Sequence, residues 1–314
     1  MLAYVIRRIL YNLLILFGIT FAVFAVARLS PIDPVKYVLQ QSGRAVGDVD
    51  PVEYARVRHQ LGLDRPIVVQ FVDYVGDLAR GDLGVSIVNQ GRRVSDILGR
   101  GVPVSLQLSS MALAVQFLVG TLLGTLAASR QNSLFDRAVM GTSIVAGSVL
   151  ALVWGVILLV PFGVTLRWFP IRGWDSPRHW VLPVLSIAAS GIAVYARFGR
   201  GAVLEQIRQD FVRTAHAKGL DGHRVLFGHV LRNALVPIVT FVGPAFAATL
   251  FGNFVIETMF GVPGVAYYAV RSSITGDYPV IQATVLIFSI AIMTVNLATD
   301  VLYRLIDPRI RVGG

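Results

Sequence analysis

Six long stretches of the chain contain no Asp, Glu, Lys or Arg, and this pattern limits the fold more than any other feature. They are residues 9–27, 101–129, 138–166, 180–196, 233–256 and 278–299. A helix needs about 20 apolar residues, within a range of about 17 to 25, to cross the hydrocarbon core of a bilayer. Five stretches reach that length easily, and residues 180–196 lie at its lower limit. The sequence therefore predicts an all-α, polytopic membrane protein with six transmembrane helices.

The composition and the distribution of charge agree with this fold class. Only 15% of the 314 residues are charged and the mean hydropathy is +0.67, whereas soluble domains carry about 25% charged residues. A net charge of +10 could indicate a nucleic-acid partner, but the charges follow the positive-inside rule. With the N-terminus in the cytoplasm, the inner segments carry 14 of the 28 Lys and Arg residues and the two short outer loops carry four. The long loop after the first span is left out of the count, because such loops translocate largely regardless of charge.

We therefore expect a multi-pass membrane protein with both termini in the cytoplasm, in contact with the lipid bilayer and not with nucleic acid. The expected organisation is a first transmembrane helix (1–30), a polar extracytoplasmic insertion (31–102), a core of five helices (103–305) and a cytoplasmic tail (306–314). The first stretch follows Arg7 and Arg8 as in a signal peptide, but its 19 uncharged residues exceed the usual 7 to 15, which favours an uncleaved span. Within the insertion and later, short helices are predicted at 51–61, 67–78 and 266–274.

A basic, glycine-containing segment separates the fourth and fifth apolar stretches, inside a cytoplasmic loop expected at 197–233. Glycine favours the left-handed backbone at the end of a helix, so two short helices broken at 218–222 are predicted. Such a compact projection is a surface that another protein can grip, with Val225, Leu226 and Val230 as its apolar face. The alternative is that its arginines face anionic lipid or merely satisfy the inside-positive bias. The candidate contact residues are Arg213, Thr214, Ala215, His216, Ala217, Lys218, Gly219, Leu220, Asp221, Arg224 and Arg232.

Several kinds of chemistry are missing from the sequence. The two lysines, Lys36 and Lys218, do not follow a glycine, so there is no phosphate-binding Gly-Lys-Ser/Thr loop, and we expect no enzymatic activity. There is no cysteine, and the five histidines form no HExxH pattern, so no metal site is expected. A self-powered carrier normally holds ionisable groups inside its spans. Only Arg28, Glu257 and Asp300 come close, and each is expected near a span end where water can solvate it.

Some polar and irregular residues in or beside the spans are candidates for a translocation path. A backbone break at membrane depth requires protein or water to satisfy the exposed groups, and Gly261, Pro263 and Gly264 interrupt an apolar segment in this way. The polar candidates are Gln107, Gln116, Asn253, Glu257 and Gln282. The alternative for each is a hydrogen bond between helices.

Taken together, these features resemble the membrane permease subunit of the oligopeptide and dipeptide family of ATP-binding-cassette (ABC) importers. Residues 213–220 look like the peptide-permease variant of the family's Glu-Ala-Ala-type motif, although Arg213 and Thr214 replace its first Glu and Ala. The resemblance covers nearly the whole chain. Further matching segments, in the order of the family, are 7–10, 29–34, 61–67, 81–86, 232–237, 255–265 and 300–308.

The resemblance implies a type I importer permease fold and a heteromeric complex in a bacterial cytoplasmic (inner) membrane. Its expected partners are a homologous second permease, two ATPase subunits or domains that bind ATP and Mg, and an extracytoplasmic peptide-binding protein. Residues 213–232 would then be coupling helices, through which the ATPases drive alternating access. The expected cargo is oligopeptides or dipeptides. The alternatives are nickel, glutathione or opines, or an ATPase-independent channel or scaffold.

Overall fold

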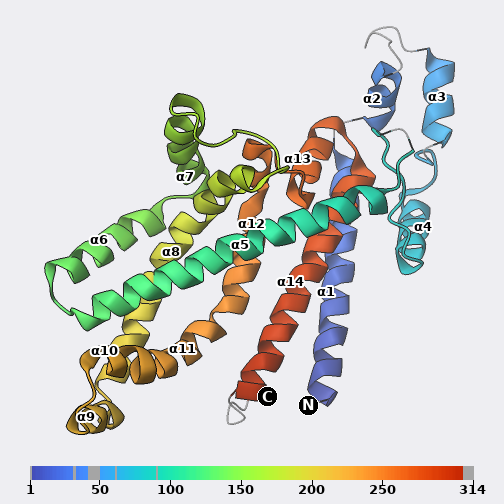
Figure 1. Ribbon diagram of the computed structural model, residues 1–314. Coiled ribbons are helices and arrows are strands. Elements are labelled where there is room, and N and C mark those ends of the chain that lie inside the picture. The colour runs from blue at the N-terminus through green and yellow to red at the C-terminus, as the bar shows by residue number, and fades with distance from the viewer. Residues whose placement is uncertain (1, 31–32, 42–49, 61, 90, 307–314) are drawn as a thin grey trace. The chain divides into compact units, whose positions relative to one another are not determined.

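The described part of the chain is almost entirely helical (Figure 1). The computed structural model describes all residues except 1, 31–32, 42–49, 61, 90 and 307–314, and leaves out the side chains of 2–5, 34, 37, 40–41, 251–253 and 300–306. Within these limits it contains no strand, and a single isolated bridge pairs Val85 with Arg93. This confirms the predicted all-α class.

The chain forms two compact units. The first unit consists of residues Met1–Val104 and Pro263–Thr294, and the second of Ser105–Val262 and Val295–Gly314. Two helices, α5 (Val94–Ser129) and α14 (Tyr278–Ile306), contribute residues to both units.

The first unit contains α1 (Leu2–Leu29), α2 (Pro34–Gln41), α3 (Pro51–Gln60), α4 (Ile67–Ala79) and α13 (Val265–Thr275). The last three match the short helices predicted from the sequence. Proline begins α3, and the Val52 backbone N–H donates to the Asp50 carboxylate at 2.9 Å. The chain turns at Gly62, whose φ is +64°. The ring of Phe71 on α4 packs on α1, with ring centroids 5.2 to 5.8 Å from those of Phe17, Phe21 and Phe24.

A buried carboxylate fixes the end of the insertion to the start of α14. The Ser86 hydroxyl donates to Asp277 Oδ2 at 2.5 Å, and the Ile87 backbone N–H donates to Oδ1 at 3.0 Å. Asp277 is fully buried, and this burial raises the pKa of its carboxyl against the opposing effect of the hydrogen bonds. Asp277 therefore connects two segments 190 residues apart in the sequence.

In the second unit, α8 (Pro177–Ile207) is the central helix and contacts most of the others. Around it lie part of α5, α6 (Leu134–Ser148), α7 (Ala151–Leu158), the π-helix η1 (Leu159–Thr165), α11 (Leu231–Thr240) and α12 (Val242–Phe260). Gly124 lets α5 approach α8 closely, because a Cβ atom there would lie only 2.5 Å from the Ala196 carbonyl oxygen. This is the role expected for small residues between membrane helices.

An ion pair joins α6 to α8. Arg200 Nε and Nη2 donate to the two oxygens of Asp136 at 2.6 and 2.7 Å. The Asp136 side chain is 3% exposed and that of Arg200 23%. Asp136 also accepts the Asn132 backbone N–H at 2.9 Å, and the Ser133 side chain accepts the Asp136 N–H. The turn between α5 and α6 is thereby attached to α8.

Four described helices are long and apolar enough to cross a membrane: Ile6–Leu29, Val94–Ser129, Pro177–Ile207 and Tyr278–Thr299. Two further spans exist only if bent helix pairs are counted as one span each. Leu134–Ser148 and Ala151–Thr165 meet at 104°, and Gly222–Thr240 and Val242–Leu250 meet at 44°. The count of six thus remains a prediction, and so do the proposed insertion and domain limits.

Candidate functional site

The polar segment after α8 folds into a short helix, a glycine turn and a second helical stretch. These are α9 (Asp210–Ala217), α10 (Gly222–Arg224), the π-helix η2 (Val225–Val230) and α11. Only Arg208 and Gln209 separate α9 from α8. The helix break falls at 218–221, within the predicted 218–222.

Two backbone hydrogen bonds close the turn after α9. The Gly219 N–H donates to the His216 carbonyl at 2.9 Å, and the Leu220 N–H donates to the Ala215 carbonyl at 3.4 Å. Gly219 has a φ of +76°. This pattern is the Schellman motif, in which glycine takes the left-handed position. The Asp221 side chain then accepts the His223 N–H at 3.1 Å and begins the next helix.

One face of this segment is anchored in the core of the second unit. Val212 and Ala215 of α9, Val225 and Val230 of η2, and Ala234 of α11 are all below 9% exposed and belong to one apolar cluster. The same cluster includes Tyr195, Ala202 and Val203 of α8 and Ala128 of α5. The apolar face predicted at Val225, Leu226 and Val230 is therefore wrong for an external partner: Val225 and Val230 are covered by the chain's own helices, and Leu226 is half-buried.

The opposite face is exposed. The exposed candidates are Arg213, Thr214, His216, Ala217, Lys218, Gly219, Asp221, Arg224 and Arg232, whereas Ala215 is buried and Leu220 half-buried. Arg213 has an exposed ion pair with Asp210 at 3.8 Å, a kind of contact that contributes little to stability. The segment thus has a fixed inner face and a free, basic outer face.

A cavity of about 320 Å³ lies elsewhere in the second unit. Gln116, Ser190, Tyr195 and Thr249 contribute polar atoms to its lining. Gln116 is 5% exposed and its amide donates to the Ile187 carbonyl at 3.3 Å, so it bridges α5 and α8. The Tyr195 hydroxyl has no hydrogen-bond partner among the described residues, although its side chain is only 1% exposed.

Ser190, Tyr195 and Thr249 were not among the candidates predicted from the sequence. Their signal was weak, because hydroxyl groups are common in membrane helices and usually bond to the preceding turn, as Thr249 does to the Ala245 carbonyl at 2.7 Å. The position of Tyr195 within an uncharged stretch was the one indication available from the sequence.

Glu257 is buried and not solvated at a span end, which corrects the expectation from the sequence. It is 0% exposed, and the Ser105 hydroxyl donates to its Oε1 at 2.6 Å. The helix α12 continues to Phe260 and ends at Gly261, whose φ is +61°, so Glu257 remains within the packed helix. Ser105 on α5 supplies a polar partner from 152 residues away. The side chain of Asp300 lies outside the described residues.

The other path candidates have different surroundings. Gln107 is exposed and accepts a long hydrogen bond of 3.4 Å from the Trp174 indole. Pro263, Gly264 and the buried Gln282 belong to the first unit, and they do not line the cavity at Tyr195. The side chain of Asn253 is not described. In the described part, no group of three or more His, Cys, Asp or Glu residues could hold a metal ion.

Comparison with known proteins gives consistent relatives. Residues 120–312 match the family described as binding-protein-dependent transport system inner membrane component, and residues 1–109 match its N-terminal counterpart. The di/tripeptide transport system permease DppB of Pseudomonas aeruginosa is 36% identical over 99% of both chains. The dipeptide permease DppB of Bacillus subtilis is 38% identical over 80% of this chain and 81% of its own length. The glutathione permease GsiC of Escherichia coli K12 is 38% identical over 99% of both chains.

A solved structure supports the same fold. The methionine ABC transporter MetNI, in an inward-facing conformation, matches with a TM-score of 0.57 at 16% identity, over 67% of this chain and 96% of that one. The family matches cover nearly the whole sequence, and these relatives are 36% to 38% identical over the aligned residues. The chain therefore belongs to the binding-protein-dependent transport system inner membrane components, in the family of peptide ABC importer permeases.

Proposed function

We propose that this chain is the permease subunit of an ATP-driven importer that carries dipeptides or oligopeptides delivered by an extracytoplasmic binding protein. The relatives named for di/tripeptide, dipeptide and glutathione transport support a peptide cargo. Glutathione is itself a small peptide and remains within this proposal. Both termini lie in the cytoplasm, and the insertion lies on the opposite side of the membrane.

The observation that carries the proposal is the division of the segment 210–232 into an anchored face and an exposed face. A partner that grips the exposed face can move the core of the second unit, because Val212, Val225 and Val230 are packed among α5 and α8. A loop that is not packed against α5 and α8 would not transmit such a displacement to them. The exposed residues Arg213, Lys218 and Arg224 give this face a basic character that suits acidic groups on an ATPase.

In this scheme the partner ATPase subunits supply the energy for transport. ATP and Mg²⁺ bind to two ATPase subunits, and a homologous second permease completes the pathway. A bound nucleotide can shift the permease between inward-open and outward-open states only if the gripping contacts differ between those states. In this chain, the cavity that Gln116 and Tyr195 line is the best candidate for a stretch of the path.

Single-cysteine labelling tests the docking surface and the orientation together, because the natural chain contains no cysteine. Ala217→Cys, on the exposed face of α9, is expected to cross-link to an ATPase subunit in inside-out vesicles. It is also expected to resist membrane-impermeant reagents in intact cells. Asp82→Cys is the matched control in the insertion, also exposed, and is expected to show the reverse behaviour. Cross-linking of Asp82→Cys in place of Ala217→Cys would refute the proposed orientation.

Uptake measurements test the cargo. Cells that lack this subunit are expected to lose uptake of labelled di- or tripeptides, and the Arg213→Glu/Lys218→Glu variant to lose ATPase association together with uptake. If these charge reversals leave flux intact, an ATPase-independent channel or scaffold is the better explanation. If deletion affects nickel or opine uptake and no peptide, the cargo assignment is wrong.

A further inference from the structure

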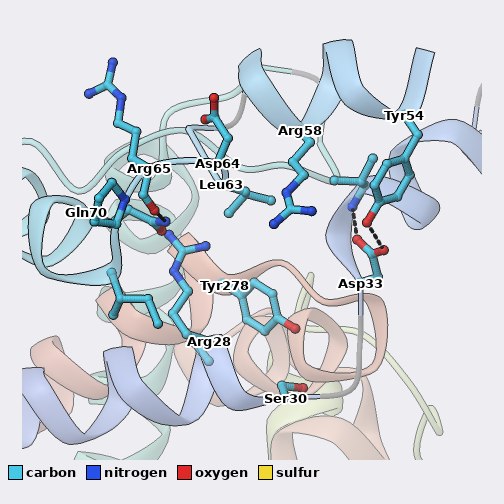
Figure 2. A pocket seen from close by; sticks show the side chains of 14 residues that line it. Arg28, Ser30, Asp33, Tyr54, Arg58, Leu63, Asp64, Arg65, Gln70 and Tyr278 are labelled. Atoms are coloured by element: carbon cyan, nitrogen blue, oxygen red, sulfur yellow. Dashed lines mark hydrogen bonds between the residues drawn. The ribbon is translucent and has the colours of Figure 1, made fainter. Parts of the chain in front are cut away.

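A hollow in the first unit is lined by charged side chains that the proposed transport scheme does not use. It has a volume of about 580 Å³ and lies between the end of α1, the helices α3 and α4 with their connecting turn, and the start of α14 (Figure 2). Small-molecule sites in proteins usually have volumes of about 300–1,000 Å³. The hollow is therefore large enough for a small organic molecule and not only for a single ion.

Two guanidinium groups point into this hollow from different helices. Arg28 comes from the last turn of α1 and Arg58 from α3, and Figure 2 shows both reaching toward its centre. Arg28 is half-buried, and its Nε has no hydrogen-bond partner among the described residues. Neither arginine forms an ion pair with a described residue; Arg28 rests on the ring of Phe24 at 5.2 Å.

The acidic residues of the lining are engaged elsewhere. Asp33 accepts the Val35 backbone N–H at 3.0 Å and the Tyr54 hydroxyl at 2.8 Å, as the dashed lines of Figure 2 show. The hydrogen bond to Asp33 raises the pKa of the Tyr54 hydroxyl, with smaller contributions from burial and from the Asp33 charge. Asp64 lies 2.7 Å from His59 Nδ1. The positive charges of Arg28 and Arg58 thus remain uncompensated by these carboxylates.

Arg28 is half-buried with an unpartnered Nε among the described residues, and a buried charge is costly unless it is paired and hydrogen-bonded. An anion beside Arg28 and Arg58 removes this cost. Arginine suits the task because its planar fork can hold two oxygens of a carboxylate or phosphate at once. The half-buried Leu63 and the buried ring of Tyr278, which is 8% exposed, provide surface for the body of a ligand.

We propose that this hollow is a binding site for a small molecule held through an oxyanion, a carboxylate or phosphate group placed between Arg28 and Arg58. The site lies at the end of the first apolar helix, so the oxyanion has two sources. One is a soluble carboxylate such as the C-terminus of a short peptide, and the other is the phosphate of a lipid headgroup. The site does not depend on the proposed transport function.

Arginine-specific labelling of the purified full transporter tests this site. The complex in dodecyl maltoside, which has no anionic group, is treated with phenylglyoxal, and modification of each arginine is followed by mass spectrometry. The probes are dialanine, dialanine amide, inorganic phosphate, and nanodiscs that contain phosphatidylglycerol. Arg56 is the matched internal control, because it is an exposed arginine of the same helix α3 that does not line the hollow.

We expect an oxyanion to slow modification of Arg28 and Arg58 several-fold and to leave Arg56 unchanged. Protection by dialanine without protection by its amide assigns a soluble carboxylate. Protection in phosphatidylglycerol nanodiscs without added solute assigns a lipid phosphate. Either of these two patterns of protection supports the site. Absence of protection in every arm, or equal protection of Arg56, overturns the proposal.

Variants provide a second measurement. Arg58→Gln removes an exposed side chain and should leave the fold intact, and it is expected to raise the concentration that half-protects Arg28 about tenfold, or about 1.4 kcal/mol. Arg56→Gln is expected to change it less than twofold. An unchanged half-protection concentration in Arg58→Gln would show that the two arginines do not share a ligand.

Discussion

Gly219 offers a direct test of the turn that presents the proposed coupling surface. Gly219 has a φ of +76°, whereas the nearby Gly222 does not adopt a positive φ. A Cβ atom added at either position meets no heavy atom within 4 Å. Substitution by alanine therefore changes packing at neither site, and only Gly219→Ala introduces backbone strain. A left-handed conformation costs an L-residue about 1–2 kcal/mol.

If the turn keeps its geometry, Gly219→Ala is predicted to lower the free energy of unfolding by about 1–2 kcal/mol. If the turn relaxes to relieve the strain, the same loss of about 1–2 kcal/mol is expected in the free energy of ATPase binding. The second outcome corresponds to about 5- to 30-fold weaker binding. Gly219→Asn should be milder, because asparagine tolerates the left-handed region better than alanine. Gly222→Ala should be neutral or slightly stabilising, since it begins a helix.

The assay has two readouts. Denaturant unfolding of the purified complex reports stability, and titration of labelled ATPase onto permease-containing nanodiscs reports binding. The expected order of effect is Gly219→Ala, then Gly219→Asn, then Gly222→Ala. If Gly219→Ala and Gly222→Ala are indistinguishable in both readouts, the left-handed turn does not determine the geometry of this surface.

Three further predictions follow from buried contacts. Removing one partner of the Arg200–Asp136 pair, as in Arg200→Met, should lower the free energy of unfolding by about 3–5 kcal/mol. The double variant Arg200→Met/Asp136→Leu should recover part of this loss in the same unfolding assay. Gly124→Ala should destabilise the second unit through its contact with the Ala196 carbonyl, whereas Gly141→Ala, with open space around it, should not; equal melting temperatures would contradict the close approach of α5 and α8. Burial raises the pKa of Asp277, so its stabilising contribution is complete below the unfolded value of about 3.9 and is lost as pH rises through the folded value. The melting temperature should therefore fall with rising pH more in the natural chain than in Asp277→Asn, and parallel pH profiles would refute this.

The sequence predicted the short helices and their breaks well, because local residues determine them. Pro51 begins α3 and Gly62 follows its end, and Gly219 marks the turn after α9. Each of these signals acts through backbone geometry within a few residues. The resemblance to peptide importer permeases, carried by motifs in order along the chain, was confirmed by the family matches.

Features that depend on distant partners could not be predicted. The bend of 104° between α6 and α7 falls within an uncharged stretch. Apolar composition shows how long such a stretch is, but not whether it bends. The sequence predicted an apolar face at Val225, Leu226 and Val230, but it could not show that the chain's own helices cover Val225 and Val230. Likewise, Glu257 looked solvated because its partner Ser105 lies on another helix.

The length of α8 has a mechanical consequence for the second unit. Its 31 residues form one continuous helix, about 46 Å long at about 1.5 Å per residue. Only two residues join this rod to α9, so a push on α9 acts at the end of a lever. A tilt of about 10° around one end displaces the other by about 8 Å over that length. A displacement of α9 would therefore tilt the whole of α8 and shift the helices that pack along it.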